Sequence, residues 1–399
     1  MSDEKLTSLH VVLCGPADVR MLEPLLGVKI PSTEVFPYAL LPTLAEEFIA
    51  AGHRVTIVST ATDIDAPLKF MGNQLGLVLV PGLRRQRDHV RDFFRTERRG
   101  LAAALRELRP DVIHAQWTYE FALGAAEAGA APVLVTARDS PLRILALELD
   151  AYRFFRLLLA IRARFSIRHV SAPSPYLARS LRWFAHFGKI PVIPNLIPAL
   201  PAVTGDVVRR SNTTVLCVAN ASRGKNVRAL LRAMALVQAQ YPDATLRLVG
   251  SGLGPGGPVE AWAREQGLDT QVAFVGHADR DVLADEYSRA AVFCFPSLEE
   301  SFGNVLIEAL QAGLPVIAGK HSGAVPWVLS QGRAGKLVDV RDPAAIAAAV
   351  CDAIDDPSST VSPGFDVAAS IAGYSPSAVA AQYVAEYRRV IAIEKDRRR

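Results

Sequence analysis

Residues 291–319 read AVFCFPSLEESFGNVLIEALQAGLPVIAG, and this stretch contains the unit from which the fold is built. An apolar run closes at Pro296 and has the composition of a buried strand, and a helical pattern runs from Gly303 to Ala312. A second apolar run, 314–319, follows the helix. Parallel strands require such a crossover helix between them. The stretch therefore predicts neighbouring parallel strands joined by a helix.

The same alternation extends from this stretch to almost the whole chain. Short apolar runs that have the character of strands occupy residues 9–15, 54–60, 76–81, 111–115, 131–137, 190–194, 213–220, 245–250, 272–276, 291–296, 314–319 and 335–340. Most are continuously apolar, as expected of parallel strands covered on both faces. Helical patterns lie between them, in two separate series. We predict an α/β protein with two Rossmann-like, doubly wound parallel-sheet domains.

The break between the two series lies at residues 194–212, where prolines and polar residues interrupt both periodicities. A chain of 399 residues is also too long for one ordinary hydrophobic core. We therefore expect a first domain over 1–195 and a second over 196–374. Residues 375–399 are expected to form a helix that packs back on the first domain, followed by a basic tail.

Composition excludes several classes of protein. Half the residues are hydrophobic and 21% are charged, which is typical of a soluble globular protein. The four cysteines have no metal-binding spacing, so neither a disulfide framework nor a metal site is expected. The N-terminus lacks the apolar core of a signal peptide, and no apolar run is long enough to span a membrane. We expect a cytoplasmic protein.

The glycine-rich stretch GSGLGPGG (250–257) imitates a dinucleotide-binding fingerprint. With Gly250 and Gly252 as the first two glycines, the third position of G-x-G-x-x-G is Pro255. The fingerprint also belongs to the first crossover of its domain, whereas this stretch follows the second strand. A dehydrogenase is therefore disfavoured, and no redox cofactor is expected.

The residues after Pro296 suggest a different ligand. Glu300 is expected in a loop at the carboxyl end of a strand, where open α/β sheets bind ligands. Gly303 allows close approach to the N-terminus of the following helix, which can hold a phosphate. Glu308, on the second turn, can accept hydrogen bonds from sugar hydroxyls. A helix with acids placed to complement its dipole is an equally acceptable reading of these residues.

Residues 296–309 resemble the E-x7-E motif of family 4 retaining glycosyltransferases, which have the GT-B fold, with Ser301 where a glycine is common. Further landmarks of that family follow in order along the chain: FIAAGHRVTIVST (48–60), RPDVIHAQW (109–117), VIPNLI (192–197), VANASRGKNV (218–227), LVGSG (248–252), VAFVGHADRDVLADEYSRA (272–290) and AGLPVIAGKHSGAVPWVL (312–329). The E-x7-E motif alone is moderately specific, whereas the ordered set is highly specific.

The resemblance implies two domains facing a cleft and a retaining transfer of a hexose from a nucleotide diphosphate sugar, most often UDP- or GDP-linked. The implied acceptor is a hydroxyl of a glycan or of a lipid-linked sugar, and no metal is required. Lys225, Glu300 and His114 are the residues implied in the chemistry. The implied donor-binding residues are Asn220, Arg223, Gly276, His277, Ser301, Phe302, Gly303, Asn304 and Glu308.

The sequence departs from the family pattern at three places. Asn220 stands where the family has an arginine, Gln116 stands where it has a second histidine, and residues 27–38 replace a Gly-Gly loop. The acceptor-side candidates are Ser32, Thr33, Gln116, Arg138 and Asp139. The departures leave two alternatives open, a nucleotide-sugar epimerase of GT-B fold and a non-catalytic sugar-nucleotide-binding protein.

Residues 149–169 form a strongly basic amphipathic pattern. Four arginines share one helical sector (Arg153, Arg156, Arg164 and Arg168), and five apolar residues share much of another (Phe154, Phe155, Leu158, Ile161 and Phe165). Together with the arginine-rich segment 84–99, this pattern suggests peripheral contact with anionic lipid at the inner face of the cell membrane. A helix that covers the core with a solvated cationic face is the alternative. No nucleic-acid-binding module is recognised.

Overall fold

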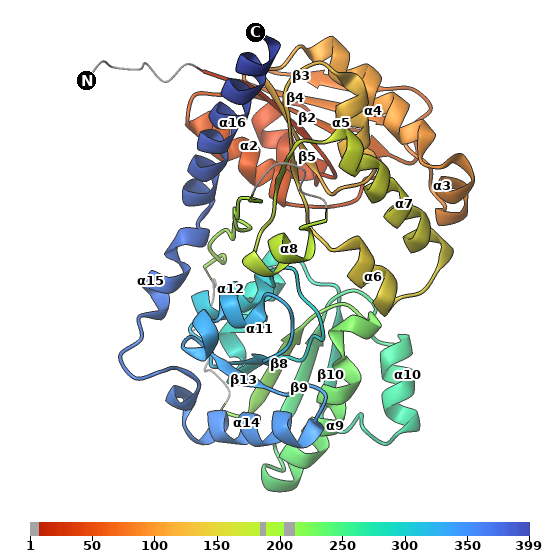
Figure 1. The fold of residues 1–399 in the computed structure, drawn as a ribbon. Helices are drawn as coiled ribbons and strands as arrows, with labels where there is room; N and C mark the ends of the chain where they lie inside the picture. The colour runs from red at the N-terminus through yellow and green to blue at the C-terminus, as the bar shows by residue number, and fades with distance from the viewer. Residues whose placement is uncertain (1–7, 184–188, 203–211) are drawn as a thin grey trace. The chain divides into compact units, whose positions relative to one another are not determined.

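The computed structural model describes residues 8–183, 189–202 and 212–399. The chain divides into two compact units (Figure 1). Unit 1 consists of Met1–Leu196 and Pro376–Arg399, and unit 2 of Ile197–Ser375. The last helix therefore belongs to the unit that begins the chain. Each unit has its own sheet and its own hydrophobic clusters, as the two series of strands predict.

The sheet of unit 1 has the strand order β3-β4-β2-β1-β5-β6-β7. Its strands are β1 (His10–Cys14), β2 (Arg54–Ala61), β3 (Leu68–Met71), β4 (Leu75–Pro81), β5 (Val112–Gln116), β6 (Val133–Thr136) and β7 (His169–Ser171). All neighbouring pairs are parallel except β3 with β4. The doubly wound architecture is confirmed.

The sequence analysis did not predict β3 or β7, and it predicted a strand over residues 190–194 where the structure has none. β3 alternates between half-buried and exposed residues over four positions, and β7 has only three residues, so neither forms a continuous apolar run. Residues 190–194 contribute a single bridge, between Val192 and Ala172. Short strands at or near a sheet edge give a weak periodic signal, which explains these errors.

Helices cover both faces of the unit 1 sheet (Figure 1). They are η1 (Val19–Leu22), α1 (Glu23–Leu26), α2 (Leu40–Ala50), α3 (Gln86–Asp92), α4 (Arg95–Leu108), α5 (Glu120–Ala128), α6 (Pro141–Leu147), α7 (Ala151–Ser166), α8 (Pro175–Ser180) and α16 (Pro376–Arg398). Val12 and Cys14 of β1 pack in one hydrophobic cluster with α4, α5 and α7, whereas Val11 and Leu13 pack in another with α2 and α16. The alternation of β1 between two buried clusters is why its sequence is apolar throughout.

The C-terminal helix α16 is integrated into the core of unit 1. Val379, Tyr383, Tyr387 and Val390 are buried in the same cluster as Phe48 of α2. The Tyr387 ring lies 5.6 Å from the Phe48 ring, edge to face. Burial of two tyrosines and two valines contributes several kcal/mol, at roughly 25 cal/mol per Å² of apolar surface. The helix is therefore a structural part of unit 1, and its hydroxyl groups enter the site described below.

The sheet of unit 2 is parallel throughout, in the order β10-β9-β8-β11-β12-β13. Its strands are β8 (Thr214–Val218), β9 (Thr245–Val249), β10 (Val272–Gly276), β11 (Val292–Phe295), β12 (Val316–Gly319) and β13 (Lys336–Val338). All six lie where the sequence predicts strands. The stretch quoted first is β11, a loop, a helix and β12.

The helices of unit 2 also lie on both faces. They are η2 (Arg223–Lys225), α9 (Val227–Gln240), α10 (Pro258–Glu265), α11 (Arg280–Arg289), α12 (Asn304–Gln311), α13 (Val325–Val328), η3 (Ser330–Gly332), α14 (Pro343–Asp355), η4 (Pro357–Thr360), α15 (Val367–Ile371) and η5 (Ala372–Tyr374). α9, α10 and α14 pack on one face, and α11, α12 and α13 on the other.

The glycines of the false fingerprint have a structural purpose. Gly250 has φ 133°, and a Cβ atom there would lie 1.8 Å from the carbonyl oxygen of Ala219. Its amide donates to the carbonyl of Gly276 at 2.6 Å. Gly250 thus allows the ends of β8, β9 and β10 to approach closely, and a side chain there would force them apart.

The predicted division of α7 into a cationic and an apolar face is wrong. Arg156 is largely buried, with its guanidinium carbon 3.8 Å from the centre of the Tyr119 ring, and Arg168 lies beyond the end of the helix at Ser166. Conversely, Phe154, Ile161 and Phe165 are exposed, Phe165 to 73%. Buried Tyr119 gives Arg156 a favourable ring face, which a helical wheel cannot anticipate. Among the described residues, no helix is long and apolar enough to cross a membrane.

Candidate functional site

The carboxyl edge of the unit 2 sheet brings together a lysine and a glutamate from loops 75 residues apart. Lys225 ends η2, just after β8, and Glu300 lies in the loop between β11 and α12. The Lys225 ammonium donates a hydrogen bond to Glu300 Oε1, and Ser297 Oγ donates to the same oxygen at 2.7 Å. Glu300 is 9% exposed. This part of the predicted site is thus a compact, charge-balanced group at the strand ends.

Backbone and amide hydrogen bonds fix the two loops against each other. The Leu298 amide donates to the carbonyl of Gly224 at 2.8 Å. The Asn226 side chain donates to the carbonyls of Val340 at 2.7 Å and of Pro296 at 3.2 Å. The loops after β8, β11 and β13 are therefore one rigid unit, which favours a precise position for Lys225.

The N-terminus of α12 is left without a side-chain cap. Gly303 is the N-cap residue and has φ 95°. A Cβ atom at this position would lie 3.0 Å from a side-chain methyl carbon of Leu306. Any side chain at this left-handed position would be strained, so glycine is required. Phe302 is buried, with its ring 5.4 Å from that of Tyr374. The first amides of α12 and the positive end of its dipole remain suited to an anion.

Glu308 lies on the second turn of α12 and accepts a hydrogen bond from the Tyr287 hydroxyl at 2.9 Å. Burial raises the pKa of Glu308 above its usual value, partly offset by the Tyr287 hydrogen bond and the charge of Arg280. Tyr287, from α11, is fully buried and was not predicted from the sequence. Its hydroxyl uses one lone pair of the carboxylate and leaves others for a ligand.

The remaining donor-side candidates lie in loops at this edge. Asn220 is exposed, and its side chain accepts from the Ser222 amide at 3.0 Å in a local turn. Gly276 ends β10 and His277 follows it, exposed. Ser301 and Asn304 are half-buried on either side of Gly303. Arg223 lines a hollow of about 830 Å³, and three further arginines line it as well: Arg228, Arg232 and Arg341. Four arginines therefore line one hollow beside η2.

In unit 1 the structure corrects the role assigned to His114. The side chain lies in the core with no exposure to solvent. Its Nδ1 lies 2.7 Å from the Tyr387 hydroxyl and its Nε2 2.7 Å from the Thr136 hydroxyl. Burial lowers the pKa of His114 well below its usual value, so the ring is neutral. A neutral ring with both nitrogens occupied is a positioning residue and does not reach a reacting atom.

Two of the acceptor-side candidates, Gln116 and Arg138, form a polar chain that begins at His114. Gln116 donates to His114 Nε2 at 3.1 Å and accepts from Arg138 Nε at 2.8 Å. Asp139 accepts from the Tyr119 hydroxyl at 2.7 Å, and burial raises the pKa of its carboxyl group. The carboxyl ends of β5 and β6 therefore place Gln116 and Arg138 in direct contact.

Residues 27–38 form an irregular loop of unit 1. Ser32 is exposed, and Thr33 is half-buried. The loop also contributes Phe36 and Tyr38, whose rings lie 6.5 and 5.6 Å from the ring of Trp117, just after β5. This aromatic group was not predicted, since aromatic residues in a loop and after a strand give no periodic signal.

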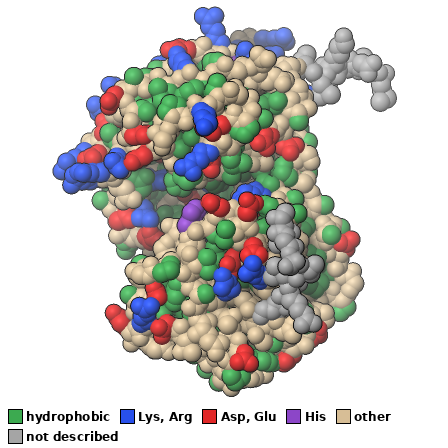
Figure 2. Space-filling view, turned by 180° about the vertical axis from the view of Figure 1, so that it is seen from behind, with side chains coloured by type: hydrophobic (Ala, Val, Ile, Leu, Met, Phe, Trp, Pro, Cys, Tyr) green, Lys and Arg blue, Asp and Glu red, His purple; other side chains and the backbone are tan. Residues whose placement is uncertain are grey.

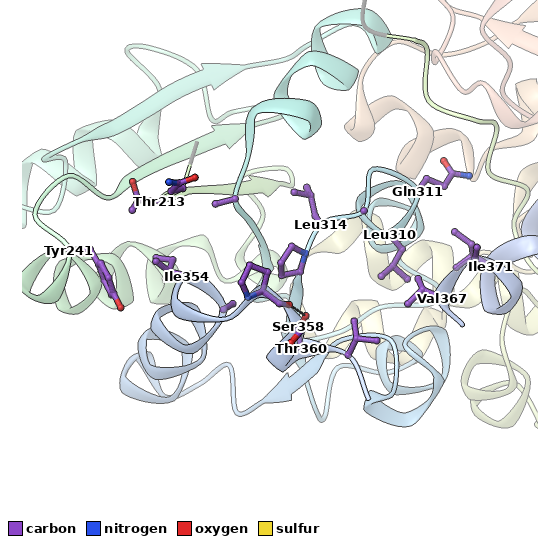
Figure 3. Close-up of a pocket in the computed structure, with 18 residues that line it drawn as sticks. Thr213, Tyr241, Leu310, Gln311, Leu314, Ile354, Ser358, Thr360, Val367 and Ile371 are labelled. Atoms are coloured by element: carbon purple, nitrogen blue, oxygen red, sulfur yellow. Dashed lines mark hydrogen bonds between the residues drawn. The ribbon is translucent and has the colours of Figure 1, made fainter. Parts of the chain in front are cut away.

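A separate cavity of about 750 Å³ lies at the opposite edge of the unit 2 sheet (Figure 3). Thr213, Ala291 and Leu314 line it, each just before one of the strands β8, β11 and β12. Most of the labelled side chains are apolar, and Gln311, Ser358 and Thr360 are polar side chains between them. This cavity is remote from Lys225 and Glu300, at the amino ends of the strands. Among the described residues, no group of three or more His, Cys, Asp or Glu side chains could hold a metal ion.

Two parallel-sheet α/β units, one with an acid pair and a lysine at the carboxyl edge, define the GT-B class of glycosyltransferase. Residues 41–199 match the family model for Glycosyltransferase Family 4, and residues 212–356 match that for Glycosyl transferases group 1. The chain therefore belongs to the family 4 glycosyltransferases.

Similar proteins of known name or structure agree with this assignment. D-inositol 3-phosphate glycosyltransferase of Corynebacterium kroppenstedtii is 36% identical over 150 residues, which cover 36% of this chain and 33% of that protein. Its counterpart in Streptomyces avermitilis is 38% identical over 136 residues, covering 32% and 29%. The matches thus span about a third of these relatives.

The resemblance to solved structures covers nearly the whole chain. Sucrose-phosphate synthase from Thermosynechococcus elongatus has a TM-score of 0.74 at 22% identity, covering 96% of this chain and 100% of that one. A UDP-forming trehalose-phosphate synthase from Burkholderia vietnamiensis has a TM-score of 0.72 at 13% identity, covering 97% and 98%. At these identities, the comparison establishes a shared fold.

Proposed function

We propose that the protein transfers a hexose from a nucleotide diphosphate sugar, UDP- or GDP-linked, to a hydroxyl of a glycan or a lipid-linked acceptor. The transfer retains the anomeric configuration and requires neither a metal nor a redox cofactor. The observation that carries the proposal is the Lys225–Glu300 pair beside the uncapped N-terminus of α12. An ammonium and the amides at a helix N-terminus, at one place, stabilise a departing diphosphate.

Each group has a chemical role in this proposal. Lys225 exchanges its contact with Glu300 for the diphosphate oxygens when the donor binds, and Glu300 then meets the hydroxyls of the transferred sugar. The amides from Phe302 to Asn304 hold diphosphate or sugar oxygens. Glu308 accepts from the ribose hydroxyls. The leaving diphosphate helps to remove the proton of the acceptor hydroxyl, which is the nucleophile. The proposal therefore requires no metal ligand and no nucleophilic side chain in the protein.

A thermal-shift screen tests the donor class. The full chain is measured with UDP, GDP, ADP, their common sugar conjugates and NAD, without added metal. A ligand at a hundred times its Kd stabilises the folded state by about 2.7 kcal/mol. We expect a shift with one nucleoside diphosphate and its sugar conjugate. A shift with NAD alone would contradict the proposal, and no shift with any of them would also count against a nucleotide-sugar donor.

An epimerase of GT-B fold is the alternative enzyme. An epimerase needs polar groups that reach the reacting sugar from the first domain, and His114 was the obvious candidate in the sequence. Because His114 is buried and both its ring nitrogens contact hydroxyl groups of the core, the residue that favoured an epimerase does not supply such a group. Incubation with the donor found by the screen distinguishes the two, since an epimerase changes the sugar without an acceptor.

A surface of unit 1 supports peripheral contact with a cytoplasmic membrane face. Phe154, Ile161 and Phe165 form an exposed apolar stripe along α7, and no acid occurs between residues 151 and 166. The neighbouring segment 84–99, which contains α3 and the start of α4, carries six exposed arginines: Arg84, Arg85, Arg87, Arg91, Arg95 and Arg99. Figure 2 shows basic side chains gathered at the left edge. Because this view is turned by 180°, the left edge corresponds to the right side of Figure 1, where α3 lies. Apolar insertion next to cations suits anionic lipid.

Replacement of Phe154, Ile161 and Phe165 by serine is expected to abolish most binding to anionic vesicles. Each serine removes apolar area that would enter the lipid, while the exposed positions leave the fold intact. Cosedimentation with phosphatidylglycerol vesicles measures the effect. Leu236→Ser, at an exposed position on α9 of unit 2, is the matched control. Equal cosedimentation of the triple variant and the wild type would exclude α7 as the contact.

A further inference from the structure

Four exposed arginines line the hollow of about 830 Å³ beside η2. Arg228 and Arg232 lie one turn apart on α9. Arg223 belongs to η2, and Arg341 lies between β13 and α14. Within the described ranges, none of the four guanidinium groups donates a hydrogen bond or forms an ion pair. The hollow therefore gathers four cations whose donors the described part of the fold does not use.

Acids of the described chain do not pair with this group. Among the described residues that line the hollow, none is an aspartate or a glutamate. The two acids next to Arg341 in the sequence are engaged elsewhere. Asp342 caps α14, and Asp339 accepts from the backbone amide of Arg341 and lies 3.8 Å from the ammonium of Lys320. Like charges held together repel one another, so an anion placed between the four arginines would be attracted by all of them.

Trp262 holds two of these arginines in place. Its indole ring belongs to α10 and is half-buried against a hydrophobic cluster of unit 2. The guanidinium carbons of Arg228 and Arg232 lie 4.8 and 5.2 Å from the centre of that ring. A guanidinium stacked on a ring keeps the donors at its edge available and loses less rotational freedom when an anion binds. Stacking does not explain Arg223 and Arg341, which contact no aromatic ring in the described chain.

The backbone of α9 adds positive potential at the same place. This helix has 14 residues, and its N-cap residue, Asn226, makes no capping hydrogen bond with its side chain. The Asn226 side chain donates to the carbonyls of Pro296 and Val340 instead. Val227, the first residue of α9, lines the hollow. The positive end of the α9 dipole therefore lies at the wall of the hollow, where it favours an anion.

The hollow is separate from the donor group, by which we mean Lys225, Glu300 and Glu308 together with the N-terminus of α12. None of these three side chains lines the hollow. α12 packs on the face of the unit 2 sheet opposite to α9, α10 and α14. The short helix η2 contributes to both places, through Arg223 to the hollow and through Lys225 to the donor group. A ligand in the hollow is thus a second anion beside the nucleoside diphosphate.

We propose that this hollow binds a compact polyphosphate, a small molecule with at least two linked phosphate groups. Its volume of about 830 Å³ lies in the range of small-molecule sites, roughly 300 to 1,000 Å³, and is much larger than one phosphate group. Arginine suits this ligand because its planar fork donates two parallel hydrogen bonds to phosphate oxygens. Four forks from three segments converge on one hollow, whereas an extended partner such as nucleic acid favours cations spread along a face. Binding of this ligand does not require the proposed transfer.

Two kinds of molecule carry linked phosphates. Inorganic pyrophosphate and triphosphate present the phosphates alone, whereas a nucleoside triphosphate adds a base and a ribose. Comparison of inorganic triphosphate with ATP and GTP separates the two sources. Affinity for the inorganic chain that equals or exceeds that for the nucleotides assigns the hollow to the phosphate chain. Tighter binding of one nucleotide, lost in the variants described below, assigns it to a nucleoside polyphosphate.

The test is calorimetric titration of the full chain without added metal. The probes are orthophosphate, pyrophosphate, triphosphate, ATP, GTP and, as an acidic peptide, hexaglutamate. We expect the wild type to bind triphosphate at least tenfold more tightly than orthophosphate, and more tightly than hexaglutamate. The additional charge-assisted hydrogen bonds of the longer phosphate chain account for that factor.

Two arginine variants assign the ligand to the hollow. The double variant Arg228→Gln with Arg232→Gln is expected to weaken triphosphate binding at least tenfold. Arg341→Gln is expected to weaken it about threefold to tenfold, and because Arg341 contacts no ring, this loss does not arise from packing against Trp262.

The matched control is the double variant Arg264→Gln with Arg289→Gln. It removes the same charge from exposed positions of unit 2 where each arginine is paired with an acid of its own helix. Lys225→Ala is the second comparison, because it removes a cation from the donor group. We expect both proteins to keep the wild-type affinity for triphosphate. Thermal melts of all variants report whether they are folded, and if the Arg228/Arg232 variant is unfolded, Arg341→Gln decides.

Four results would overturn the inference. Equal affinity of the wild type for orthophosphate and triphosphate would exclude a polyphosphate ligand. Full triphosphate affinity in folded Arg341→Gln and in the folded double variant would exclude the hollow. Loss of triphosphate binding in Lys225→Ala alone would place this ligand in the donor group. Tighter binding of hexaglutamate than of triphosphate would assign the four arginines to an acidic protein partner.

Discussion

Lys225→Ala is expected to lower the transfer rate by a factor of about a hundred to a thousand, with little change in thermal stability. A preorganised donor aimed at developing negative charge contributes this much to a transition state. The side chain is 24% exposed, so its loss removes little packing, and Ser297 still donates a hydrogen bond to the Glu300 carboxylate. Steady-state kinetics with the donor found by the screen gives kcat, and a thermal melt of the same sample reports stability.

The control for this variant is Lys320→Ala, in the same unit. Lys320 is 45% exposed and lies 3.8 Å from Asp339, so its removal deletes a similar charge that is paired with a different carboxylate. We expect Lys320→Ala to keep full activity. A Lys225→Ala protein with a normal kcat would remove Lys225 from the chemistry, and one that is unfolded at room temperature would assign it a structural role.

Glu308→Ala is expected to weaken nucleotide binding ten- to a hundredfold. The carboxylate is proposed to accept from two ribose hydroxyls, and a hydrogen bond to a charged group contributes about 1.5 to 3 kcal/mol. Because the Tyr287 hydroxyl donates to Glu308, the alanine also leaves this buried hydroxyl with only the more distant carbonyl of Val305, at 3.3 Å, as acceptor. Calorimetric titration with the nucleoside diphosphate measures the loss. Glu265→Ala, an exposed acid at the end of α10, is the control.

The protonation of Glu308 gives a second measurement at the same residue. Its pKa is raised by burial, so the folded protein favours the protonated form, and its contribution to stability is lost as pH rises through the folded-state pKa. Glu308→Gln, which cannot ionise, is therefore expected to be at least as stable as the wild type at pH 7. Wild-type nucleotide affinity should fall on acidification at a higher pH than an ordinary glutamate would give, and that pH dependence should be absent in Glu308→Gln.

The acid pair at Glu300 and Glu308 shows what a local pattern can establish. The strand that ends at Phe295, the glycine at 303 and the helix that begins at Asn304 are all set by residues within about fifteen positions of each other. Periodicity and turn chemistry act over the same distance, so the sequence predicted this segment closely. The pairing of Lys225 with Glu300 was not visible in the spacing. The family resemblance implied both residues in the chemistry but did not predict their hydrogen bond.

By itself, the sequence determined the two series of parallel strands, all six strands of unit 2 and the position of the acid pair, because a continuously apolar strand or an amphipathic helix reveals itself locally. Only the tertiary structure decided the state of His114, since its partner Tyr387 lies 273 residues away on α16. It also decided which side chains of α7 are buried, because Tyr119 of another segment accommodates Arg156. Burial and hydrogen-bond partners depend on contacts between distant segments, and a single chain read in order does not record those contacts.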